Sequence, residues 1–109
     1  MKLVDLIDYL KSEDKLEQLF IDEKLNTESE AIIICMEKAL DINSEIRLFE
    51  LEETGGNLVF EKRGITYVEL FPAYHAMEII ESYFTLPEEK KLSNLGIANR
   101  LLEYRIKDA

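Results

Sequence analysis

The sequence has little of the material from which disulfides, metal clusters and membrane spans are made. Its 109 residues include one cysteine, one histidine, four glycines, two prolines and no tryptophan. A single cysteine excludes an internal disulfide and a thiolate metal cluster within one chain, and a single histidine leaves a zinc site short of ligands. The longest apolar run, residues 31–36, is far shorter than the roughly 20 residues that cross a bilayer. We therefore expect no membrane span, no metal and no cofactor.

Basic residues are scarce in the first half of the chain. Residues 1–54 carry 15 Asp or Glu against 6 Lys or Arg, whereas residues 55–109 carry 8 against 7. Nearly all of the net charge of −10 therefore lies in the first half. Net charge governs steering and association rather than fold. The pattern favours a basic protein partner and disfavours nucleic acid, whose phosphates are attracted by Lys and Arg.

The length and composition predict one globular domain, residues 1–109. No stretch rich in Pro, Gly or Ser divides the chain, and 47% hydrophobic residues supply enough apolar surface for a core. The N-terminus alternates Asp with Leu and Ile and lacks the basic start of a signal peptide. We expect a cytoplasmic protein in which Cys35 is a small buried hydrophobe.

Helical periodicity dominates the first part of the chain. Apolar residues spaced three and four apart predict a helix over residues 3–10, and Ser12 predicts the N-cap of a second helix. Thr27 and Glu30 have the spacing of a capping box, in which each side chain satisfies the other's backbone donor. Because an apolar run follows at once, we expect a central helix over residues 31–40.

Helical periodicity returns in the last third. Pro72 suits the first turn of a helix, and an apolar stripe follows it, formed by Ala73, Ala76, Met77, Ile80 and Phe84. Ser93 predicts the start of a last helix, which is basic and continues through Leu101, Leu102 and Ile106.

Between these regions the pattern alternates as in strands. Gly55-Gly56 predicts a two-residue turn joining strands over residues 46–53 and 58–62, and Arg63-Gly64 leads into a third strand over residues 65–71. The order of elements predicts an α+β fold. We expect N-terminal helices, a three-stranded antiparallel β-meander, and C-terminal helices packed on the sheet.

The predicted hairpin concentrates carboxylates on one face of the sheet. A two-residue turn places Glu50 opposite Glu61, with Glu52 on the same face. Opposed like charges are unfavourable unless cations meet them, so this face is the expected partner-binding site. Its residues are Glu45, Glu50, Glu52, Glu53 and Glu61.

The same carboxylates leave a catalytic alternative open. Glu50, Glu52 and Glu61 beside Lys62 would suit a metal-dependent hydrolase, in which magnesium positions the attacking water. The order of helix, three strands and helix is similar to the core of restriction-type nucleases. That family separates its carboxylate from its lysine by one residue, whereas Glu61 and Lys62 are adjacent. We nominate no catalytic residue and expect His75 to be an exposed or half-buried histidine.

In size, acidity and fold class the chain looks like the bacterial immunity proteins that neutralise toxins by masking basic nucleases. The resemblance implies an interaction module that inhibits a basic protein, and the sequence favours such a module over an enzyme without deciding between them. A homodimer joined through an exposed edge strand or an apolar helix face is the remaining alternative.

Overall fold

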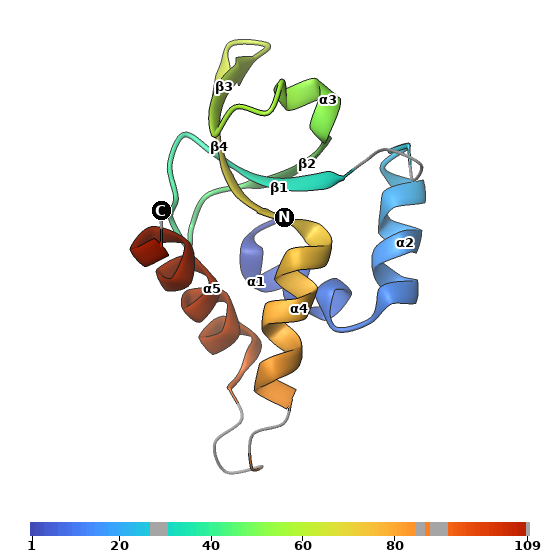
Figure 1. Cartoon of the computed structure of the whole chain (residues 1–109), viewed down its shortest axis with the longest axis vertical. Coiled ribbons are helices and arrows are strands. Elements are labelled where there is room, and N and C mark those ends of the chain that lie inside the picture. The colour runs from blue at the N-terminus through green and yellow to red at the C-terminus, as the bar shows by residue number, and fades with distance from the viewer. Residues whose placement is uncertain (27–30, 85–86, 88–91, 109) are drawn as a thin grey trace.

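The computed structural model describes residues 1–26, 31–84, 87 and 92–108, in which five helices and one four-stranded antiparallel sheet form an α+β fold (Figure 1). The sheet has the strand order β2-β1-β4-β3. The α+β class is confirmed, whereas the expected three-stranded meander is wrong. The elements are α1 (Leu3–Leu10), α2 (Glu13–Asp22), β1 (Ile32–Glu37), β2 (Ile46–Glu50), α3 (Leu51–Thr54), β3 (Val59–Lys62), β4 (Ile65–Pro72), α4 (Ala73–Phe84) and α5 (Asn94–Asp108).

The helices predicted at both ends of the chain are confirmed. The Ser12 hydroxyl accepts a hydrogen bond from the Lys15 N–H at 3.4 Å, which caps α2. Ser93 does the same for α5 by accepting from the Gly96 N–H at 3.2 Å. The proposed capping box at residues 27–30 lies outside the described residues.

The helix expected over residues 31–40 is wrong, since this segment forms β1, an inner strand of the sheet. The five residues from Ile32 to Met36 are all buried, with side chains that alternate between the two faces. A short apolar run has no periodicity to separate a buried helix from a strand covered on both faces. The β-branched Ile32, Ile33 and Ile34 favour the strand, where branched side chains pack well.

The expected hairpin at Gly55-Gly56 is also wrong. β2 ends at Glu50 and runs directly into α3, where the Glu50 N–H donates to the Glu53 carboxylate at 3.3 Å. Gly55 has a φ of 64° and forms the C-cap of α3 rather than a turn between strands. β2 therefore pairs with β1, placing Glu50 opposite Ile32. Consequently Glu50 and Glu61 do not face one another.

The tight hairpin of this sheet lies at the predicted Arg63-Gly64 turn. Both residues have positive φ, 54° and 79°, as a two-residue hairpin turn requires. The turn pairs β3 with β4, so that Glu61 lies opposite Thr66. This part of the predicted strand pattern is confirmed.

Two hydrophobic clusters lie on opposite faces of the sheet. Figure 1 shows α1, α2, α4 and α5 on one side of β1 and β2, and α3 on the other. The helix side holds the larger cluster, centred on residues such as Leu6, Phe20, Ile34 and Ile80. The other side holds a small cluster in which the ring of Phe49 meets two further aromatic rings edge-on. No helix in the described part of the chain is long and apolar enough to span a membrane.

Candidate functional site

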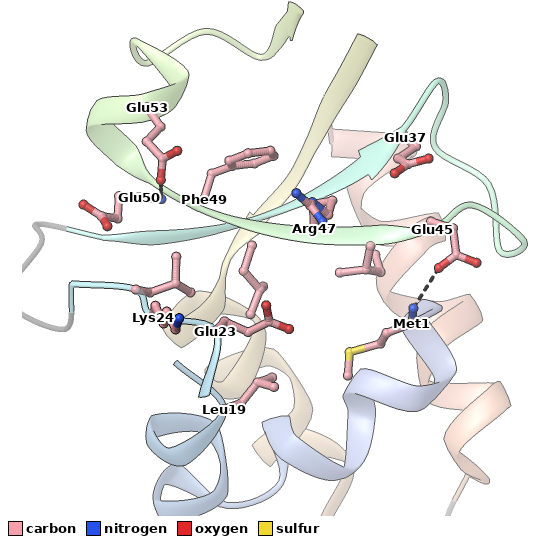
Figure 2. Close-up of a pocket in the computed structure, with 13 residues that line it drawn as sticks. Met1, Leu19, Glu23, Lys24, Glu37, Glu45, Arg47, Phe49, Glu50 and Glu53 are labelled. Atoms are coloured by element: carbon pink, nitrogen blue, oxygen red, sulfur yellow. Dashed lines mark hydrogen bonds and ion pairs between the residues drawn. The ribbon is translucent and has the colours of Figure 1, made fainter. Parts of the chain in front are cut away.

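A groove of about 420 Å³ follows β2, which is an edge strand of the sheet. We call it the β2 groove. Figure 2 shows Glu37, Arg47 and Phe49 on one side of the strand, and Leu19, Glu23 and Lys24 on the other. Its lining residues come from the ends of α1, α2 and β1, from β2 and from α3: Met1, Leu19, Glu23, Lys24, Leu25, Glu37, Glu45, Ile46, Arg47, Leu48, Phe49, Glu50 and Glu53.

Two carboxylates of the groove are held at the start of β2 and at α3 by cations. Glu45 accepts from the Met1 amino group at 2.7 Å and from Lys2 Nζ at 3.3 Å, and these bonds lower the pKa of its carboxyl. Glu53 is paired with Lys62, and the hydrogen bond from Lys62 lowers the pKa of Glu53 although partial burial opposes the shift. Both groups are therefore already neutralised within the fold.

Glu50 has a structural role of a different kind. Its carboxylate accepts a hydrogen bond from the Asn26 N–H at 3.1 Å, which ties the segment after α2 to the end of β2. Glu50 therefore lines the groove, and the hydrogen-bond donor to its carboxylate is a backbone N–H rather than a cationic side chain.

Two further carboxylates in the groove have no polar partner in the described chain. Glu37 is partly buried at the end of β1, and Glu23 is exposed just after α2. The guanidinium of Arg47 is also exposed and unpaired among these residues. A partner entering the groove would thus meet Glu23 and Glu37 as open acceptors and Arg47 as an open donor.

The structure brings together only part of the predicted acidic site. Glu45, Glu50 and Glu53 line the β2 groove. Glu52 lies on exposed α3 outside it, and Glu61 is exposed on β3 at the opposite edge of the sheet. The expected cluster of Glu50, Glu52 and Glu61 is therefore not formed, because Glu52 lies on α3 while Glu50 and Glu61 lie on opposite edge strands of the sheet.

Sequence reasoning missed Glu23, Glu37 and Arg47. The sequence pattern predicts a helix at Glu37, and it predicts a strand at Arg47 whose neighbour is the strand over residues 58–62 rather than β1. The available signal was the β-branched run before Glu37, which fits a buried strand and would have made β2 its neighbour.

The described residues offer no arrangement that suits a metal ion. No group of three or more His, Cys, Asp or Glu side chains gathers among them closely enough to hold one. His75 lies half exposed with Nδ1 3.9 Å from Glu78 Oε2. It is therefore an exposed histidine beside a carboxylate, as expected from the sequence.

Cys35 is fully buried in β1, as expected. Burial raises the pKa of its thiol to about 12, and the charge of Glu69 adds to the shift. Because the thiolate is the nucleophile and the metal ligand, Cys35 stays protonated and unreactive at neutral pH.

The Glu53–Lys62 pair predicts a pH-dependent contribution to stability. The folded-state pKa of Glu53 is lowered, so its stabilisation is present above the unfolded value of about 4.3 and is lost as the pH falls through the folded value. Both side chains are about one-third exposed, so Glu53→Gln should cost only about 0.5 kcal/mol at pH 7. Urea unfolding should show the difference shrinking below about pH 4. Glu61→Gln is the control and should change little at either pH; an equal loss in both variants would contradict the assignment.

Comparison with known proteins gives no match to a protein-family model and no significant similarity to curated proteins or to solved structures. What the protein binds must therefore be inferred from the geometry and charge of the β2 groove.

Proposed function

We propose that the protein is an interaction module that captures a basic partner protein through the β2 groove. The observation that carries the proposal is the surplus of carboxylate acceptors in a concave surface, where Glu23 and Glu37 have no polar partner among the described residues. A cationic partner would supply the missing counter-charges. The field of a chain with net charge −10 would also accelerate the encounter.

The proposal has an inhibitory version. If the basic surface of the partner is also its working surface, occupation of the groove would mask it. That is the role implied by the resemblance in size and acidity to bacterial immunity proteins, whose partners are basic toxins. The inhibitory version adds one requirement, namely that capture abolishes an activity of the partner.

The hydrolase alternative has lost its structural premise. It needed Glu50, Glu52 and Glu61 to converge beside Lys62, and these residues lie on β2, α3 and β3 at different parts of the sheet. Binding through a groove requires no such convergence. The interaction module is therefore the function that the geometry supports best.

Capture of a cationic segment can be measured directly with a synthetic probe. We expect a fluorescent peptide of about six alternating lysine and valine residues, the length of a typical strand, to bind the intact protein. Raising the salt from about 0.05 M to about 0.5 M should weaken binding at least tenfold, because screening shortens the reach of the groove's charges. Fluorescence anisotropy gives the dissociation constants.

The matched control is a peptide in which every lysine is replaced by glutamate. It should not bind, since it has the same apolar residues and the opposite charge. Equal affinity for the two peptides, or no binding of the lysine peptide at low salt, would refute the proposed function.

A further inference from the structure

The β2 edge carries backbone groups that are free to pair with another strand. Antiparallel strands alternate between residues that exchange hydrogen bonds and residues that do not. The Glu37 N–H donates to the Glu45 carbonyl at 3.0 Å, and the Leu51 N–H donates to the Ala31 carbonyl at 2.9 Å. With the register of β1 and β2, these bonds place the backbone groups of Ile46, Leu48 and Glu50 on the outer side of β2.

Two of the outward donors are already used at the ends of the strand. The Ile46 N–H donates to the Met1 carbonyl at 2.7 Å, and the Glu50 N–H donates to Glu53. Between them, the Leu48 N–H, the Leu48 carbonyl and the Ile46 carbonyl have no partner within the described part of the chain. The Met1 contact shows that this edge accepts main-chain pairing from outside the sheet.

The walls of the groove suit alternate side chains of an added strand. Successive side chains of a strand point to opposite faces, so one set would lie on the side of Glu37, Arg47 and Phe49. The other set would lie on the side of Leu19 and Glu23 (Figure 2). Leu19 is almost completely buried and offers an apolar contact beside the carboxylate of Glu23. A carboxylate thus lies on each side of β2, so a segment in which basic residues alternate with apolar ones meets one of them whichever way it faces.

We infer that the partner binds as a fifth strand, with an extended basic segment hydrogen-bonded to Leu48 and Ile46 along the outer edge of β2. This inference rests on the proposed function and adds its binding mode. Main-chain hydrogen bonds provide affinity that is independent of sequence, and the side-chain surfaces provide specificity. The acidic walls select a cationic segment.

A partner protein fits this edge better than a second copy of the chain. A self-pairing through β2 would bring together two molecules that each carry a net charge of −10. It would also bring together two copies of a groove in which carboxylates outnumber cations, since Glu23, Glu37, Glu45, Glu50 and Glu53 line it against Lys24, Arg47 and the Met1 amino group. Charge complementarity therefore selects a basic segment as the occupant.

The first test removes the outward donor of β2. In Leu48→Pro the ring eliminates an N–H that the ladder with β1 does not use, and proline is tolerated in an edge strand when its nitrogen faces outward. Leu48 also packs against the helix-side cluster, so Leu48→Ala is the matched control that loses the side chain and keeps the N–H. We expect Leu48→Pro to bind the lysine–valine peptide about tenfold more weakly than Leu48→Ala does.

The second test modifies the peptide and leaves the protein unchanged, so it stands even if Leu48→Pro does not fold. An added strand turns every second amide toward β2. N-methylation of the valine amides and N-methylation of the lysine amides should therefore have unequal effects, with one isomer losing about tenfold in affinity and the other little.

The outcomes separate the inference from the function on which it rests. Salt-sensitive binding in which both methylated isomers have equal affinity would overturn strand addition and leave the acidic groove in place. A dimer of the free protein that Leu48→Pro dissociates, seen by sedimentation, would also overturn it in favour of self-pairing. Failure of the unmodified lysine peptide to bind would instead remove the proposed function.

Discussion

Ile34→Ala is expected to lower the free energy of unfolding by about 3 kcal/mol. Ile34 has no exposed surface and lies in the middle of β1, where it belongs to the helix-side cluster with residues such as Leu6, Phe20 and Ile80. Truncation removes the transfer free energy of the buried carbons and leaves a cavity that the rigid neighbours fill only in part. For a chain of this size the melting temperature should fall by about 15 °C. Urea unfolding followed by circular dichroism measures the loss.

Ile34→Val is the matched control. It removes one methyl group, keeps the β-branch that suits a strand, and should cost only about 1 kcal/mol. If Ile34→Ala lowered the free energy of unfolding no more than Ile34→Val does, residue 34 would not be enclosed between the sheet and the helices. That result would contradict the placement of β1 as an inner strand.

The parts of the fold that the sequence predicted are those with a local cause. α1 and α2 are predicted by apolar residues that share one side of each helix, and the start of α2 is predicted by the Ser12 hydroxyl that caps its first turn. The β3–β4 hairpin follows from Arg63-Gly64, where positive φ is needed. These signals depend on a few adjacent residues, so they could be read without the rest of the chain.

β1 could not be predicted in the same way, because its environment is built from distant segments. One face is covered by helices, and Phe49 and Tyr67 help to cover the other. A run of buried residues with no exposed side has no period, so periodicity alone does not separate a helix from a strand. Once β1 is misplaced, β2 loses its true neighbour, and Gly55 is taken for a turn rather than for the C-cap of α3.

The misplacement of β1 also made the predicted functional site incomplete. Glu45, Glu50 and Glu53 are predictable because acidic residues are dense around β2 in the sequence, and all three line the groove. Glu37 joins them only through the pairing of β1 with β2, in which it lies opposite Glu45. The free edge itself depends on which strands are neighbours, and no single segment encodes that.

Reversing two charges in the β2 groove is expected to have the largest effect on binding. In the double variant Glu23→Lys and Glu37→Lys, the two carboxylates without a described partner become cations on opposite sides of β2. Whichever side its lysines face, the extended lysine–valine peptide would lose the attraction of one carboxylate and meet a repulsion from the lysine that replaces it. The second new lysine would repel the peptide from the other side, and like charges brought together in an interface are costly. We expect its dissociation constant to rise about 30-fold at low salt, equivalent to about 2 kcal/mol. Fluorescence anisotropy measures the change.

The control must separate the groove from the overall charge, since four units of charge are removed from a chain that carries −10. Glu78→Lys with Glu81→Lys changes the net charge by the same amount on exposed positions of α4, outside the groove. Because screening limits each charge to about 10 Å at moderate salt, the α4 variant should retain most of the affinity. An equal loss in both variants would mean that net charge alone attracts the peptide, and a loss confined to the α4 variant would place the binding surface on the helices.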